Sequence, residues 1–273
     1  MKEGIRELQL KELELLLMFK KICEENDLRY YLLGGTLLGA VRHNGFIPWD
    51  DDIDVCMPRS DYDRFIQIVF NHLQTPYILY CPERNPDFRY CWARLSDSSA
   101  KVMNYSANIP REEEVWIDII PLDGWPHNKA RQLFHKSKLF FWRALNQVAQ
   151  YDEIVDQKRK RRLIEKILVD IAAWKIWRKI TNYPYCISRI CRELRKYKYD
   201  DSEWVINYMA AYGFKEYFKK EWFGTGEVLD FEGAKVNAPA NWDSVLKTIY
   251  DDHYMQLPPE EERDKHNTVI VEI

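Results

Sequence analysis

The chain has 273 residues, of which 46% are hydrophobic and 30% charged, and its formal net charge is −3. This composition excludes collagen-like and disordered proteins, and the near balance of charge argues against dedicated nucleic-acid binding. The length fits one large domain or a core with an appended part. The six cysteines form no Cys-x-x-Cys pair and no zinc-like spacing with histidine, so we expect reduced thiols. Because no signal peptide or membrane span is apparent, the expected location is cytoplasmic.

The amino-terminal part begins with an amphipathic pattern. Apolar residues recur at a near-helical period over residues 5–25, which predicts a helix that supports the core. Residues 30–33 form a short apolar run that ends at Gly34-Gly35, typical of a buried strand entering a tight turn. A short helix is predicted over residues 37–42.

The next stretch predicts a strand followed by a helix and then further strands. Residues 54–57 have the pattern of a strand, and apolar residues at helical spacing over 62–73 predict a helix after Pro58. Three β-rich runs follow. They cover residues 77–81, 88–95 and 115–120.

Charge is distributed unevenly along the chain. Residues 129–198 contain 19 Lys and Arg against 6 Asp and Glu, a net charge of +13, whereas the other residues carry −16. Apolar spacing in the basic stretch is helical. The predicted organisation is a mixed α/β core over residues 1–125, a basic helical subdomain over 126–215, and a segment over 216–273 that closes on the core.

The densest chemical signal is the acidic run from Asp50 to Asp54. If Asp52 and Asp54 lie two apart on one strand, their side chains share a face and can bind one hard cation. Mg²⁺ commonly combines one or two carboxylates with waters and substrate phosphates, so a phosphate-bearing substrate is implied. The glycine pair Gly34-Gly35 before a helix is suited to seat a phosphate. The alternative for the acidic run is a solvated turn.

A second carboxylate, Asp118, stands alone in an apolar run from Val115 to Ile120. An unpaired buried carboxylate is costly, so Asp118 requires a metal or a cationic partner. We predict that it joins Asp52 and Asp54 as a catalytic and metal-binding triad. The alternative is a salt-bridged structural aspartate.

Four segments resemble the LicD family, which includes bacterial phosphocholine transferases and, more distantly, fukutin-like transferases. The resemblance covers residues 28–123 and 231–266. It rests on Gly34 to His43, Ile47 to Asp54, Ile117-Asp118 with Pro121 to Gly124, and the tail from Phe231 to His266. Two departures are Asp251, where the tail motif has Gly, and the basic middle, which matches no known pattern.

The resemblance implies an α/β (α+β) fold with a nucleotidyltransferase-like mixed sheet core and a helical subdomain. It also implies a Mg²⁺-dependent phosphotransferase, with Mn²⁺ as the alternative ion. Such an enzyme moves phosphocholine, or another phosphorylated alcohol, from its CDP conjugate to a sugar hydroxyl. The acceptor is a cell-surface glycan or lipid-linked precursor of the teichoic acid or lipopolysaccharide type.

On this basis Asp52 and Asp54 hold the metal, and Asp118 completes its shell or accepts the hydroxyl proton. A quaternary ammonium such as choline requires an aromatic cage, with candidates Trp49, Trp92, Trp116 and Trp125. The residues expected to bind substrate are Gly34, Gly35, Thr36, Arg42, His43, Trp49, Arg94, Arg263 and His266.

The basic run from Lys158 to Arg162 beside an apolar, Trp-bearing stretch suggests peripheral contact with the anionic inner face of the plasma membrane. A solvated helix face and binding to an anionic glycan are the alternatives. Two other functions remain open at this point. One is a nucleotide-sugar glycosyltransferase with an Asp-x-Asp metal site, and the other is a non-catalytic membrane or glycan adaptor.

Overall fold

The computed structural model describes residues 4–70, 72–105, 109–150, 182–209, 213–263 and 268–273. Its α-helices are α1 (Ile5–Glu25), α2 (Gly34–His43), α3 (Arg59–Phe70), α4 (Lys129–Ala149), α8 (Tyr183–Leu194) and α9 (Trp242–Tyr250). Its strands are β1 (Tyr31–Leu32), β2 (Asp54–Pro58), β3 (Tyr77–Tyr80), β4 (Ala93–Asn104), β5 (Arg111–Gly124), β6 (Trp204–Ile206), β7 (Tyr217–Lys219), β8 (Glu227–Phe231), β9 (Ala234–Ala238) and β10 (Thr268–Glu272). Short 3₁₀ turns are η1 (Gly213–Lys215), η2 (Lys220–Trp222) and η3 (Glu260–Glu262).

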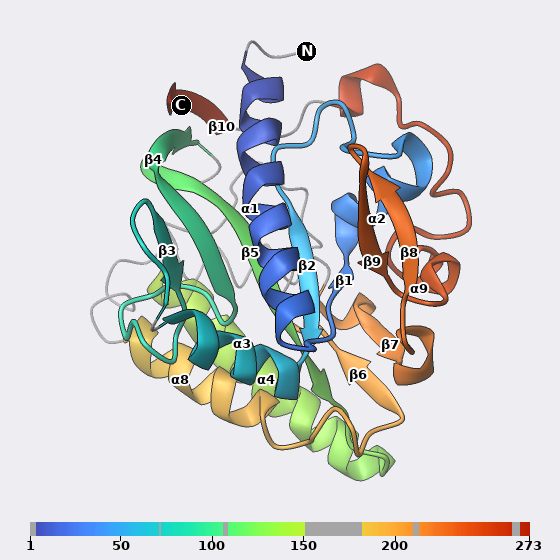
Figure 1. Cartoon of the computed structure of the whole chain (residues 1–273). Helices are drawn as coiled ribbons and strands as arrows, with labels where there is room; N and C mark the ends of the chain where they lie inside the picture. Colours follow the sequence, from blue (N-terminus) through green and yellow to red (C-terminus); the bar gives the residue numbers. More distant parts are fainter. Residues whose placement is uncertain (1–3, 71, 106–108, 151–181, 210–212, 264–267) are drawn as a thin grey trace.

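The core is a mixed sheet with the strand order β1-β2-β5-β4-β10 (Figure 1). β3 also pairs with β4, while β6 pairs with the end of β5 and β7 pairs with β6. Among the described strands, β2 and β5 are the one parallel pair. The predicted α/β class with a mixed sheet is thus confirmed.

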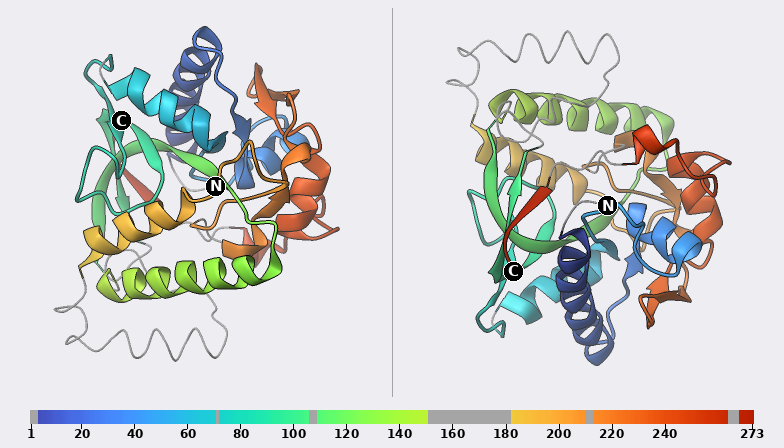
Figure 2. Two further views of the ribbon diagram at one scale, coloured as in Figure 1. Left: turned by 90° about the horizontal axis from the view of Figure 1, so that it is seen from below. Right: turned by 90° about the horizontal axis from the view of Figure 1, so that it is seen from above.

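Helices cover both faces of this sheet. Figure 2 shows α1 and α3 on one side and α4 with α8 on the other. The middle of β5 is therefore buried on both faces: Val115, Ile117 and Ile119 are fully buried on one face, and the other face places the carboxylate of Asp118 beside the buried Ile120. On α1, the buried positions Leu8, Leu15 and Phe19 lie on one face, which is why the sequence period identified this helix.

A second, smaller core lies between α4, α8 and the β6-β7 pair. It contains Trp125, Leu139, Ile187, Ile190 and Ile206. The carboxyl-terminal hairpin β8-β9 contacts α2 and β1, and β10 pairs with β4. β6 falls in the predicted subdomain 126–215 and β10 in the predicted segment 216–273, yet both pair with strands of the core. The division of the chain at residues 125 and 215 stays a prediction.

Two predicted elements differ from the structure. The strand expected over residues 88–95 begins only at Ala93 and continues to Asn104. Residues 88–92 instead form an irregular aromatic segment, while the polar residues after Leu95 are held in the strand by pairing with β5. The glycine pair also differs, because Gly34 is already the first residue of α2 rather than part of a preceding turn.

Candidate functional site

The register of the parallel pair brings two predicted site residues together. Asp54, the first residue of β2, lies opposite Asp118 of β5. Chain separation gave no indication of this pairing, because it depends on the crossover through α3, β3 and β4. The amino end of β2 therefore presents two carboxylates from different parts of the sheet.

Asp52 is not on a strand. Asp51 to Ile53 have an irregular backbone, and β2 begins only at Asp54. The expectation that Asp52 and Asp54 share a strand face is therefore wrong. The two side chains are nevertheless close enough that the charge of Asp52 raises the pKa of Asp54.

The glycine pair of α2 lies directly against this acidic segment. A Cβ atom on Gly34, whose φ is +57°, would lie 3.2 Å from Oδ2 of Asp54, and a Cβ on Gly35 would lie 2.6 Å from Oδ2 of Asp50. A side chain at Gly35 would overlap the carboxylate, so glycine is required there by close approach. The amino end of α2 thus faces carboxylates, which the helix dipole stabilises.

Thr36 has a defined role in this arrangement. Its hydroxyl accepts a hydrogen bond of 2.8 Å from the backbone N–H of Asp54. This bond ties the first turn of α2 to the first residue of β2, so Thr36 orients Asp54. Its predicted role in substrate binding stays a prediction.

Asp118 is held by two donors at one oxygen. Its Oδ1 accepts 2.7 Å from the Trp92 indole N–H and 2.9 Å from Nε of Arg94. The salt-bridged state that the sequence left open for Asp118 is therefore present. It does not exclude a catalytic role, because Oδ2 of the same carboxyl takes no part in these two bonds.

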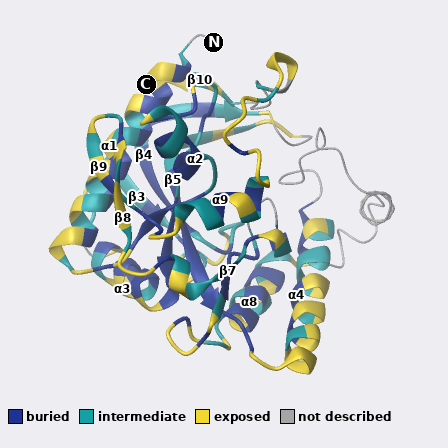
Figure 3. Cartoon of the chain, turned by 90° about the vertical axis from the view of Figure 1, so that its right-hand side faces the viewer, coloured by how far each residue is buried: buried dark blue, intermediate teal, exposed yellow. Residues whose placement is uncertain are grey.

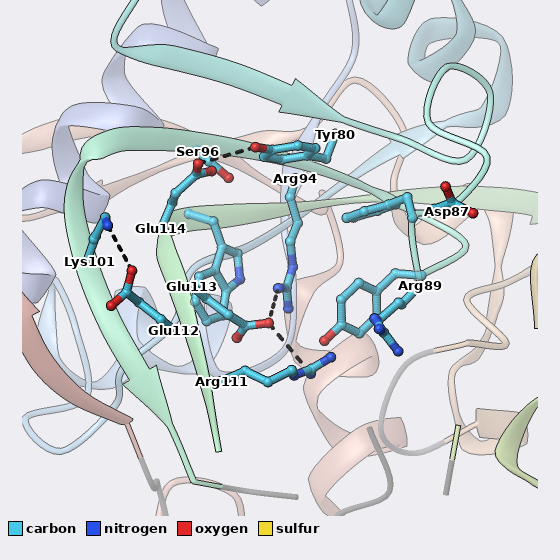
Figure 4. A pocket seen from close by; sticks show the side chains of 13 residues that line it. Tyr80, Asp87, Arg89, Arg94, Ser96, Lys101, Arg111, Glu112, Glu113 and Glu114 are labelled. Carbon is cyan, nitrogen blue, oxygen red and sulfur yellow. Dashed lines mark hydrogen bonds and ion pairs between the residues drawn. The ribbon is translucent and has the colours of Figure 1, made fainter. Parts of the chain in front are cut away.

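Arg94 connects Asp118 to a cavity of about 430 Å³. Its guanidinium lies between the rings of Tyr90 and Trp116, 4.1 Å from each centroid, and its Nη1 is 3.4 Å from Oε1 of Glu113. Glu113 also pairs with Arg111, and Figure 4 draws both interactions. The cavity is lined by aromatic rings and by charges of both signs, beside the carboxylate of Asp118.

Two acidic residues near the site have no counterpart among the sequence predictions. Glu12 of α1 is 3% exposed, and burial followed by the charges of Asp52, Asp51 and Asp50 raises its pKa well above the usual value. Its position four residues from both Leu8 and Leu16, on the apolar face of the helix, is a signal that could have identified it. Glu216, which accepts 2.6 Å from Nδ2 of Asn207, is the second.

The electrostatics of the site favour a cation. Burial raises the pKa of Asp54 well above its usual value, and Asp52, Asp118 and Glu216 raise it further. Carboxylates collected in this way must bind a proton or a positive charge. Within the described part of the chain, no three His, Cys, Asp or Glu side chains are arranged to hold a metal ion by themselves. The metal roles of Asp52, Asp54 and Asp118 therefore stay predictions.

The basic residues near the motif contact the carboxyl-terminal tail. Nη1 of Arg42 donates to the carbonyl oxygens of Tyr254 and Gln256, at 3.2 and 3.4 Å, and Nε of Arg42 lies 3.0 Å from Nε2 of His43. Arg263 lies over the ring of Trp49, at 5.4 Å. The structure thus brings four of the predicted substrate-binding residues to one region, while His266 lies outside the described residues.

The four tryptophans proposed for an aromatic cage do not lie together. Trp92 and Trp116 flank the Arg94–Asp118 pair, whereas Trp49 lies against Arg263 and His43. Trp125 is buried in the second core. The four candidates are thus distributed over three places, and which of them would contact choline stays a prediction.

Membrane contact through the basic run at residues 158–162 falls outside the described residues. Across the described helices, none combines the length and apolar character that a bilayer crossing needs. All six cysteines are free, and five of them are buried, as expected for reduced thiols.

Comparisons with known proteins agree with the position of these motifs. Residues 27–152 match the family described as LicD/FKTN/FKRP, nucleotidyltransferase domain. The lipopolysaccharide cholinephosphotransferase LicD of Haemophilus influenzae is 29% identical over 96% of this chain and 96% of its own length. The ribitol 5-phosphate transferase FKRP of Homo sapiens is 53% identical over 34 residues, 12% of this chain and 7% of that protein. This chain therefore carries a nucleotidyltransferase domain of the LicD/FKTN/FKRP type at residues 27–152.

Proposed function

We propose that this protein is a phosphotransferase that moves a phosphorylated alcohol from its CDP conjugate to a sugar hydroxyl of a surface-glycan precursor. We favour CDP-choline as the donor and phosphocholine as the transferred group. The reason is that the relative matched over nearly the whole chain is named a lipopolysaccharide cholinephosphotransferase. The observation that carries the proposal is the opposition of Asp54 and Asp118 in the β2–β5 register, beside the Gly34-Gly35 end of α2. A teichoic acid precursor is the other acceptor type that we propose.

The carboxylates of the site suit Mg²⁺ as the bound ion, with Mn²⁺ as the alternative. Magnesium usually takes one or two protein carboxylates and fills its other positions with water and substrate phosphates. Asp52 and Asp54 would hold the ion, and two carboxylates meet this requirement without a third. When bound, the ion would neutralise charge on the donor diphosphate and the departing CMP.

The other groups position and polarise the reactants. Hydrogen bonds from Trp92 and Arg94 fix Asp118 through Oδ1, so we assign Oδ2 to accept the proton of the acceptor hydroxyl. The cavity behind Arg94, with its rings and mixed charges, is the place that we propose for the acceptor sugar. Arg42 and His43 remain candidates for contact with the diphosphate.

The test is nucleotide release from a panel of donors. The full chain is incubated with Mg²⁺ and a glycan acceptor, and with CDP-choline, CDP-ribitol, CDP-glycerol or a UDP-sugar in turn. We expect CMP release that requires the acceptor and ends on chelation, with CDP-choline as the best donor. Release of UDP without release of CMP would identify a glycosyltransferase. The absence of both, in protein shown to bind CDP-choline, would indicate a non-catalytic adaptor.

A further inference from the structure

The outer side of α4 carries large apolar side chains that contact water. Leu133, Phe134, Phe140 and Phe141 are 69%, 64%, 53% and 54% exposed. Figure 3 shows the outward side of α4 as exposed along most of its length. Single exposed apolar residues are ordinary, but four on one helix form a patch that marks an interaction surface.

These side chains form one stripe along the helix. At 3.6 residues per turn, positions 133, 137, 140 and 144 fall on one side, with 134 and 141 beside them. On this side of the helix the small residue Ser137 lies between Leu133 and Phe140, and Ala144 follows Phe140. The opposite side of α4 buries His135, Leu139 and Asn146 and packs against α8. The stripe is therefore held in place by the folded protein and does not need to form on binding.

The charge beside the stripe has one sign. The sequence of α4 contains no Asp or Glu but five Lys and Arg residues. Lys129 and Arg131 are exposed at the first turns on either side of the stripe, and Nζ of Lys138 lies 4.4 Å over the ring of Phe134. A helix with an apolar face, basic flanks and no acidic residue is typical of one that lies in the interface of an anionic membrane.

We propose that α4 is a membrane-docking surface, whose apolar stripe enters the headgroup and acyl boundary of an anionic lipid bilayer. Charge complementarity favours lipid over a second copy of this chain, because two such stripes would bring basic flanks of the same sign together. The stripe is made of residues 133–141 of α4 and does not include the basic run at residues 158–162. The inference does not rest on the proposed transfer reaction, since it concerns binding alone.

The experiment measures partitioning of the full chain onto vesicles. Phosphatidylcholine vesicles, with or without 30% phosphatidylglycerol, are sedimented with wild-type protein at low and high salt. We expect binding that requires phosphatidylglycerol and weakens with salt. Phe134→Ser/Phe141→Ser should weaken it at least about tenfold, since two aromatic rings no longer enter the interface. Lys129→Gln/Arg131→Gln should weaken it by about twenty-five-fold, at roughly fivefold for each charge.

Val228→Ser is the matched control, because Val228 is 58% exposed but lies on β8. It should bind vesicles as wild type does. Thermal unfolding of each variant shows whether the stripe is instead covered by another part of the same chain, in which case the Phe variant loses stability. Three results would each overturn the proposal. The first is a loss of stability in the Phe variant, and the second is equal vesicle binding by wild type and Phe variant. The third is a concentration-dependent dimer that the Phe variant abolishes.

Discussion

The carboxyl of Asp54 is placed by three contacts that each come from a different part of the chain. The hydroxyl of Thr36 accepts from its backbone N–H, Gly34 leaves room beside its Oδ2, and Asp118 stands opposite it in β5. The folded chain therefore stabilises a position that is unfavourable for an isolated charge. Such a site gains stability when its charge is removed and loses function when it cannot bind a cation.

The first prediction follows for Asp52→Asn and Asp54→Asn. Transfer should fall by about three orders of magnitude or more in each, because the carboxylates proposed for the metal are lost. The free energy of unfolding should be unchanged or rise by up to about 1 kcal/mol, because each substitution removes one of several like charges that repel one another in the wild type. CMP release and urea unfolding measure the two quantities.

Asp230→Asn is the control, since Asp230 pairs with Lys235 at the surface of the β8-β9 hairpin. It should leave transfer unchanged. Full transfer by either site variant would show that the metal role is wrong.

The second prediction concerns Gly35. In the wild type, Gly35→Ala should lower both transfer and stability, because the new Cβ would lie 2.6 Å from Oδ2 of Asp50. In the Asp50→Ala background the same change should leave the protein's stability unchanged or raise it by up to about 1 kcal/mol, because alanine has a higher helix propensity than glycine. Urea unfolding of the four proteins gives the coupling between the two positions. An equal effect in both backgrounds would show that the contact does not require glycine.

At the scale of elements, a buried ion pair joins the start of α3 to the end of β5. Nε and Nη2 of Arg59 donate to the two oxygens of Asp123 at 2.8 and 2.7 Å. Both residues are buried, so neither has water as a substitute partner. Asp123, which belongs to the family motif, therefore ties the end of β5 to the start of α3 through Arg59.

The third prediction is that Arg59→Met lowers the free energy of unfolding by about 3–5 kcal/mol, because it leaves the Asp123 carboxylate buried without its partner. The double variant Arg59→Met/Asp123→Leu should recover most of that loss, since no charge stays buried. Denaturant unfolding measures both. If the double variant is no more stable than the single one, the pair contributes through packing rather than through charge.

At the scale of the whole molecule, the second core makes the protein sensitive to acid. His135 of α4 lies between the rings of Trp125 and Tyr197, at 5.0 Å from each, and its side chain is 3% exposed. Burial lowers the pKa of His135 to about 4, against the opposing effect of Glu193. The neutral imidazole is thus the form that fits the fold.

The fourth prediction follows from that shift. The unfolded chain binds a proton at His135 near its ordinary pKa of about 6.5, whereas the folded chain binds one only near 4. The stability from this group is therefore complete above about pH 6.5 and is lost as the pH falls toward 4, by roughly 3 kcal/mol in all. Urea unfolding between pH 7 and pH 4 measures the loss, and His135→Gln should show a shallower dependence. Parallel curves for the two proteins would contradict the assignment.

Local patterns determined much of this protein. The period of apolar residues identified α1 and α3, because one buried face imposes a spacing on every helix that packs against a sheet. The acidic run, the glycine pair and the isolated Asp118 were visible as chemistry for the same reason, since each breaks the expected pattern of its element. The resemblance to the LicD family then indicated that the acidic run, the glycine pair and Asp118 belong to one site.

Only the tertiary structure decided which of these groups meet and how. The pairing of Asp54 with Asp118, the hydrogen bonds of Trp92 and Arg94 to Asp118, and the burial of Glu12 below the acidic run all join residues far apart in sequence. The extent of β4 and the irregular backbone at Asp52 likewise depend on strand pairing, which a local pattern does not encode. The residue types along the chain show which partners each side chain needs, such as a cation beside a buried carboxylate. Strand register and packing set the distances between these groups, and ion pairs, pKa values and catalysis depend on those distances.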